Sequence, residues 1–178
     1  MALTRPAGAW ACPDLAVLPD EQTRSEIIDR QLFEMPSPTL AHARAIMAMI
    51  RLLLSLPDRL GGTLFTAPLD VFVAGADSVQ PDIVALLTGG ACSVRRGIEG
   101  PPDLLVEALS PSNRAHDQAP KRALSARGGV CESWIVDPEQ RVIEVINARG
   151  VIVHRVDAGG APVLRSPLLG ELLSRWTR

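Results

Sequence analysis

Tyrosine is absent from this chain of 178 residues, and lysine occurs only once, as Lys121. Lysine and arginine together number 18, so the remaining 17 basic side chains are all arginine. Arginine is therefore the default carrier of positive charge, and the one exception is informative. A lysine ammonium is a compact charge whose pKa shifts readily, whereas a guanidinium stays protonated. Lys121 is thus a candidate for chemistry that needs an amine.

Cysteine is scarce as well, with three residues far apart at Cys12, Cys92 and Cys131. No pair has the C-x-x-C spacing, which excludes a recognisable zinc site, and an odd number argues against a disulfide framework. No apolar run approaches membrane-spanning length, and prolines interrupt the first 20 residues before a signal-peptide core can form. These absences predict a cytoplasmic protein without a membrane segment.

Strong charge of either sign is also missing, because the net charge is −2 and the pI is near 5.9. Proteins that rely on non-specific phosphate contacts are usually basic, so the whole-chain charge argues mildly against tight DNA binding. The stretch 95–127 differs slightly: six basic and four acidic residues give it +2, which leaves −4 for the rest.

Apolar residues make up 47% of the chain, which is enough for one folded domain of this length. Residues 1–22 lack a clear period and predict a loosely ordered lead before a single domain over 23–178. "SEIIDRQLFEM" predicts a bent strand or a short hairpin. A helix follows, with Ser37 as N-cap and Pro38 at its first position, and it ends before Pro57. Its apolar residues at helical spacing are Ala43, Met47, Ile50 and Leu54.

Strands dominate the rest of the predicted domain. "GTLFTAP" and "LDVFVA" predict a strand pair, whereas "PDIVALL" and "PDLLVEALS" predict two buried strands that each begin with Pro-Asp. A helix over 117–127 is expected to stop at Gly128 and Gly129. "ESWIVD", "RVIEVIN" and "VIVHRV" complete one mixed sheet flanked by helices, which is an α/β fold, and "SPLLGELLSRW" predicts a last short helix.

Acidic side chains accompany both Pro-Asp strands. In the second strand, alternation places Asp103 and Glu107 on the same face, opposite Leu104 and Val106. Glu107 interrupts an apolar strand, and a buried carboxylate needs a partner or a metal ion because burying it alone is costly. Asp82, at the start of the neighbouring strand, would supply a second carboxylate. Two such ligands suit Mg²⁺ or Mn²⁺, and a nearby ammonium would orient water or neutralise charge on a phosphorane.

The run "GIEGPPDLLVEALSPSNRAHDQAPKRALSARGGVCESWIVDPEQRVIEV" resembles the signature of the Uma-type "putative restriction endonucleases" of the PD-(D/E)XK nuclease superfamily. The resemblance extends upstream through "SVQPDIVAL" and "SEIIDRQLFEMPSPTLAHARAI" and downstream to "SPLLGEL", so it covers roughly residue 24 to the C-terminus. Its specific parts are "PDLLVEALSPS" and "GGVCESWIVDP". It implies a restriction-endonuclease-like fold and metal-dependent cleavage of nucleic acid.

The resemblance also implies roles for individual residues. Asp82 matches the acid of the Pro-Asp motif and Glu107 the acid of the Glu-X-Lys motif, so these two would hold the metal. Leu109 occupies the usual lysine position, and Lys121 matches the place where this family takes its lysine from the following helix, to orient or activate water. Asp103 matches a further polar position of the family pattern, and we expect it to support the metal ligands without binding the metal itself. Further matching positions are Asp117, Glu26 and His42.

The chain departs from the family pattern at three positions. Arg30 stands where glycine is usual, and Ser125 and Ser133 replace tyrosines, which removes aromatic bulk beside the expected site. These departures bear on activity more than on the fold.

Ordinary structural roles are the alternatives for the candidate residues. Lys121 and Asp117 have the spacing of a surface ion pair, and Asp117 is equally suited to cap its helix. Pro-Asp at a strand start is also common turn chemistry. His42 and Trp134 are expected in the core rather than at a ligand.

The sequence therefore predicts a Mg²⁺- or Mn²⁺-dependent endonuclease that acts on nucleic acid, with DNA as the first candidate, and that works as a homodimer. One alternative is a nuclease fold that has lost turnover and serves as a binding or assembly module. Another is hydrolysis of a different phosphoester. The residues do not choose between DNA and RNA and specify no recognition sequence.

Overall fold

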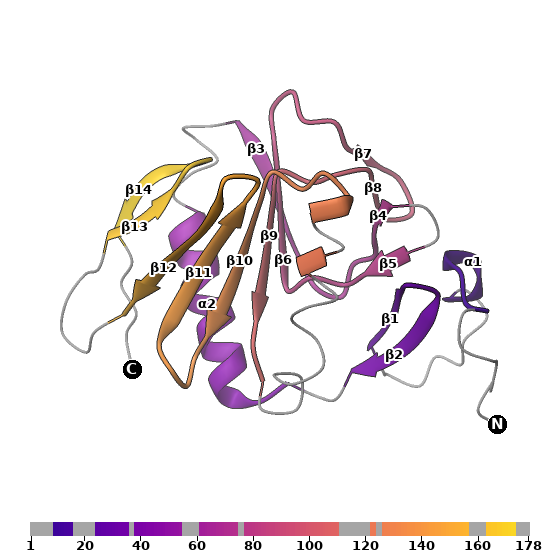
Figure 1. Cartoon of the computed structure of the whole chain (residues 1–178), viewed down its shortest axis with the longest axis horizontal. Coiled ribbons are helices and arrows are strands. Elements are labelled where there is room, and N and C mark those ends of the chain that lie inside the picture. The colour runs from indigo at the N-terminus through magenta and orange to yellow at the C-terminus, as the bar shows by residue number, and fades with distance from the viewer. Residues whose placement is uncertain are drawn as a thin grey trace.

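The computed structural model describes residues 9–15, 24–35, 38–54, 61–74, 77–110, 122–123, 126–156 and 163–173. Strands outnumber helices in this part of the chain (Figure 1). The elements are α1 (Cys12–Leu15), β1 (Arg24–Ile28), β2 (Gln31–Met35), α2 (Leu40–Leu53), β3 (Gly62–Thr66), β4 (Val71–Ala74), β5 (Asp77–Val79), β6 (Ile83–Leu87), β7 (Ser93–Val94), β8 (Ile98–Glu99), β9 (Leu104–Ala108), β10 (Glu132–Asp137), β11 (Val142–Asn147), β12 (Gly150–Arg155), β13 (Val163–Ser166) and β14 (Gly170–Leu173).

The central sheet has the strand order β12-β11-β10-β9-β6-β3. The β9–β10 pair is parallel and the other pairs are antiparallel, so the predicted mixed sheet is confirmed. The chain segment between β9 and β10 must return to the same end of the sheet, because parallel neighbours need a crossover. Within that crossover, residues 122–123 and 126–127 are helical, and the turn at 128–129 follows with Gly129 at φ +77°. The predicted stop at the two glycines is therefore confirmed.

A second sheet, with the order β2-β1-β5-β4-β8-β7, was not anticipated. The predicted pairing of "GTLFTAP" with "LDVFVA" is wrong, because β3 pairs with β6 in the central sheet whereas β4 pairs with β5 and β8. Pro68 and the three residues that accompany it between β3 and β4 carry the chain from one sheet to the other. The hairpin alternative for "SEIIDRQLFEM" is confirmed by β1 and β2. Its two turn residues, Asp29 and Arg30, have φ values of +49° and +61°, a conformation that favours glycine.

Helix α2 covers one face of the central sheet (Figure 1). It begins two residues later than predicted, because Thr39 rather than Ser37 is the N-cap and accepts a hydrogen bond from the His42 N–H. The predicted apolar stripe is also wrong: Ala43, Met47 and Leu54 are exposed. The helix is apolar on most sides, so periodicity could not select the buried face. The residues that it buries are His42, Ala45, Met49 and Leu53.

The two faces of β9 belong to two different apolar cores. Leu104, Val106 and Ala108 pack with α2, whereas Leu105 packs with the second sheet through residues such as Val71 and Ile98. The predicted alternation along this strand is thus confirmed, and Glu107 faces away from α2.

The C-terminal part ends in a hairpin of β13 and β14, so the predicted last helix is wrong over 166–173. Pro167 and Gly170, which has φ +83°, suit a turn rather than a helix. The buried carboxylate of Glu132 anchors this turn, because Oε2 accepts the Leu168 N–H at 3.1 Å and Oε1 accepts the Ser166 hydroxyl.

Near the N-terminus, Trp10 is buried and its backbone N–H donates a hydrogen bond to the backbone carbonyl of Arg30. Part of the predicted N-terminal lead therefore contacts the domain. The rest of residues 1–22 lies outside the described residues, apart from 9–15. No described helix is long and apolar enough to cross a membrane.

Candidate active site

Asp82 lies immediately before β6 and is almost fully buried. Its Oδ2 accepts the Ala108 N–H at 2.9 Å and lies 3.0 Å from Nε2 of His42, in the first turn of α2. An ionised carboxylate only accepts hydrogen bonds, so Nε2 of His42 carries the proton in this pair. His42 is buried, as expected for a core residue, but it also contacts Asp82, the expected metal ligand.

Glu107 reaches the same end of the β6–β9 pair. The antiparallel register aligns Ile83 with Val106, which places Asp82, the preceding residue, level with Glu107. The bond from Ala108 to Asp82 confirms this proximity of the two chain segments. The prediction that the two Pro-Asp strands are neighbours is therefore confirmed.

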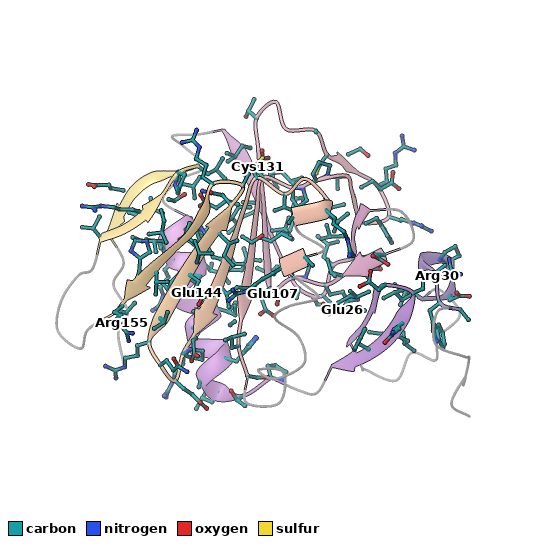
Figure 2. The ribbon with its side chains drawn as sticks, viewed as in Figure 1. Glu26, Arg30, Glu107, Cys131, Glu144 and Arg155 are labelled. Carbon is teal, nitrogen blue, oxygen red and sulfur yellow. The ribbon has the colours of Figure 1, made fainter. Side chains whose placement is uncertain are left out.

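Glu26 approaches this end from the second sheet. It is a fully buried residue of β1, and its Oε1 accepts the N–H of Gln80 at 2.9 Å. Because Gln80 lies two residues before Asp82, this bond fixes the backbone that leads into the site. Glu26 and Glu107 belong to different sheets, and Figure 2 labels Glu26 to the right of Glu107.

A cavity of about 350 Å³ opens on the face of β9 that carries Glu107. Its walls are mainly apolar, with Leu105, Ile135 and Ile146 from three adjacent strands. The polar side chains that line it include Glu107, Arg122, Ser133 and Asn147.

Arg122 enters this cavity from the crossover between β9 and β10, and its Nη2 forms an ion pair with Oε2 of Glu144 on β11. Neither Arg122 nor Glu144 was predicted from the sequence as a site residue. A signal was available for Glu144, because it interrupts the apolar strand "VIEVIN" as Glu107 interrupts "LLVEAL".

Asp103 is not brought together with Asp82 and Glu107. It precedes β9, and its Oδ2 accepts the Leu87 N–H at 2.8 Å at the end of β6. Asp103 is four residues from Glu107, which corresponds to about 13 Å along a strand. Since β6 and β9 are antiparallel, the two Pro-Asp motifs lie at opposite ends of the pair.

Lys121, Asp117 and Ser125 lie outside the described residues. The described residue that follows Lys121 is Arg122, which lines the cavity with Glu107. The distance from the Lys121 ammonium to the carboxylates therefore stays a prediction.

Trp134 and the two arginines at the start of the stretch 95–127 have structural partners. Trp134 is fully buried and donates its Nε1–H to Glu132 at 2.7 Å, so its expected core role is confirmed. Arg95 pairs with Glu99, and Arg96 stacks over the ring of Phe72 at 4.7 Å.

Asp82 and Glu107 are hard oxygen donors of the kind that an ion of the Mg²⁺ type uses. Mg²⁺ keeps several waters and uses only one or two protein carboxylates, so two are sufficient. The Asp82 carboxylate is held in the fold through Oδ2, which contacts Nε2 of His42 and accepts the Ala108 N–H. Within the described ranges, no group of three or more His, Cys, Asp or Glu side chains is arranged to hold a metal ion.

The comparisons with known proteins point in one direction. The chain matches the model of the Uma2 family, described as "Putative restriction endonuclease", over residues 11–174. A solved structure with a TM-score of 0.73 and 18% sequence identity is a "putative nuclease belonging to DUF820" from Anabaena variabilis ATCC 29413; the likeness covers 90% of each chain. At this identity the likeness shows the fold, which confirms the predicted nuclease-like α/β architecture. No curated protein matches the chain significantly.

Proposed function

The chain belongs to the Uma2 "putative restriction endonuclease" family, and from this premise we propose that it hydrolyses phosphodiester bonds of nucleic acid, DNA in the first place, with Mg²⁺ or Mn²⁺. One observation carries the proposal. The β6–β9 register brings Asp82 and Glu107 to the same end of two paired strands, next to a cavity that opens beside Glu107.

Asp82 and Glu107 would hold the ion in this proposal. When bound, Mg²⁺ supplies positive charge that stabilises the developing charge on the phosphoryl oxygens. His42 and the Ala108 N–H hold the Asp82 carboxylate in one orientation. Lys121, which the sequence places one residue before the cavity-lining Arg122, would orient or activate the attacking water.

Asp103 has a different part in this proposal from the one expected from the sequence. Its bond to Leu87 lies at the far end of the β6–β9 pair, so its support of the site is limited to fixing the register of the two strands.

Cleavage assays with matched variants test the proposal. Purified protein is incubated with single- and double-stranded DNA and with RNA, each with Mg²⁺ or Mn²⁺, beside Glu107→Gln and Lys121→Ala. The exposed Glu171 on β14 provides a matched control, Glu171→Gln. We expect wild type and control to cleave, and both site variants to lose activity by at least about 10²-fold.

Two outcomes would contradict parts of the proposal. Cleavage by wild type that survives both site substitutions would remove the site assignment. No cleavage of any substrate, together with no calorimetric signal for Mg²⁺ or Mn²⁺, would favour the alternative, an inactive nuclease fold that binds or assembles. The net charge of −2 and Ser133, a small side chain in the cavity wall, support this alternative.

A homodimer and a cytoplasmic location are also proposed. The edge strand β12 supports self-association, because it exposes three consecutive apolar side chains at Val151, Ile152 and Val153. Sedimentation of the purified protein at micromolar concentration measures the oligomeric state, and a strictly monomeric profile would remove the dimer.

A further inference from the structure

The cavity face of the central sheet carries two glutamates in one row. Glu107 on β9 is level with Ile135 on β10, and Ile135 is level with Glu144 on β11. Adjacent strands lie about 4.8 Å apart, so the two glutamate positions are about 10 Å apart across the sheet. Both side chains are on the face that turns away from α2, and Figure 2 shows them beside each other.

Arg122 lies over this row. Its guanidinium is bonded to Glu144 through Nη2, its side chain is about one-third exposed, and it lines the cavity together with Glu107. A charge in such a half-buried, largely apolar cavity acts through a lower effective dielectric constant than a charge in water. Arg122 is therefore the described cation placed to act on a ligand beside Glu107.

A phosphodiester that approaches Glu107 would meet a surface with carboxylates on two strands. It needs cations to offset that repulsion, and a guanidinium fork matches phosphate oxygens in a bidentate geometry. Glu144 holds Nη2 of the Arg122 guanidinium in place. The Arg122 side chain is therefore already ordered before a ligand binds, and binding loses less conformational entropy.

We propose that Arg122 contacts a backbone phosphate of the nucleic acid in this cavity and that Glu144 is its positioning residue. The inference rests on the proposed function, since it names the group that binds the substrate at the same site. Arg122 contributes both to affinity and to the stabilisation of charge in the transition state.

Arg127 provides a matched control from the same crossover. Its Nη2 donates a hydrogen bond to Asp29, in the β1–β2 turn, at 2.8 Å and forms an ion pair with Asp77 of β5 at 3.6 Å, and Arg127 does not line the cavity. Each of the two substitutions, Arg122→Gln and Arg127→Gln, therefore removes one positive charge and one ion-paired arginine. Only Arg122→Gln removes a side chain that lines the cavity.

The salt dependence of binding separates a phosphate contact from a structural ion pair. Affinity for single-stranded and double-stranded DNA oligonucleotides is measured by fluorescence anisotropy over a series of NaCl concentrations without divalent ions. Loss of one phosphate contact reduces the slope of log K against log salt by about 0.7 for single strands and about 0.9 for duplexes. We expect this change for Arg122→Gln and none for Arg127→Gln.

Cleavage in Mg²⁺ gives the second readout. Arg122→Gln is expected to lower kcat by about 10²-fold or more. Arg122→Lys keeps the charge and the salt slope but recovers only part of kcat, because an ammonium cannot bind in a bidentate way. Glu144→Gln keeps the slope as well and lowers kcat with little change in KM, since it loosens the guanidinium without removing it.

The inference is overturned if wild type binds and cleaves but Arg122→Gln has the same salt slope and kcat. It is also overturned if Arg122→Gln and Arg127→Gln lose binding and thermal stability alike, which would identify a structural pair. If wild type neither binds nor cleaves nucleic acid, the proposed function fails and the inference falls with it.

Discussion

Replacing His42 by alanine tests whether the hydrogen bonds around Asp82 serve metal binding. Oδ2 of Asp82 has two partners, Nε2 of His42 at 3.0 Å and the Ala108 N–H at 2.9 Å. His42→Ala removes the first contact and leaves the second, so the carboxylate loses one of the contacts that hold it. Side chains that hold a metal ligand in this way contribute about 10–100-fold to metal affinity. That range corresponds to about 1.4–2.8 kcal/mol of binding free energy.

The same substitution also affects stability. Asp82 is buried, with 4% of its surface exposed, and the loss of a hydrogen bond to a buried carboxylate costs about 1.5–3 kcal/mol. We therefore expect the urea midpoint of His42→Ala to fall while the slope of the unfolding transition stays unchanged.

Calorimetric titration with Mn²⁺ measures the affinity, and the matched control is His154→Ala. His154 is a half-buried histidine of β12 whose Nε2 contacts the backbone of Arg165, so it has no role at Asp82. Asp82→Asn provides the reference for a lost ligand. The reasoning is refuted if His42→Ala binds Mn²⁺ within twofold of wild type at a temperature where both are folded, while Asp82→Asn does not bind.

Three further predictions concern other parts of the chain. Glu132→Ala leaves two buried donors and one half-buried donor without their acceptor and should lower the free energy of unfolding by about 3–6 kcal/mol in urea titrations; a loss below 1 kcal/mol would contradict this. Asp103→Ala should cost about 1–2 kcal/mol of stability yet leave kcat within twofold, so a large loss of activity would return Asp103 to the active site. Burial, then Asp103 and Cys131, raise the pKa of the Cys92 thiol. At pH 8 the exposed Cys131 should therefore be alkylated faster than Cys92, as followed by mass spectrometry. Equal rates would contradict the raised pKa of Cys92.

Much of the strand content could be predicted because its local signals are strong. Short apolar runs bounded by Pro-Asp, and the alternation of Leu104, Leu105, Val106 and Glu107, define β9 and its two faces without tertiary information. The burial of Trp134 was expected for the same reason. These features depend on side-chain period and composition alone.

Pairing partners and helix faces could not be predicted in the same way. β3 joins β6 rather than β4, a choice made by contacts between residues distant in the chain. α2 is apolar on most of its circumference, so only the sheet against which it packs selects Met49 rather than Met47 for burial. The C-terminal hairpin depends on Glu132, which holds its turn from 36 residues away at Leu168.

The sequence by itself predicted the kind of site: a carboxylate in an apolar strand, a second one beside the neighbouring strand, and a single lysine that follows them. It also contained two Pro-Asp motifs that look equivalent, and only the tertiary structure distinguished them. Because β6 and β9 run antiparallel, their starts lie at opposite ends of the pair. Asp82 is therefore level with Glu107, whereas Asp103 is bonded to Leu87 at the far end. Strand direction is decided by long-range pairing, which no local pattern encodes.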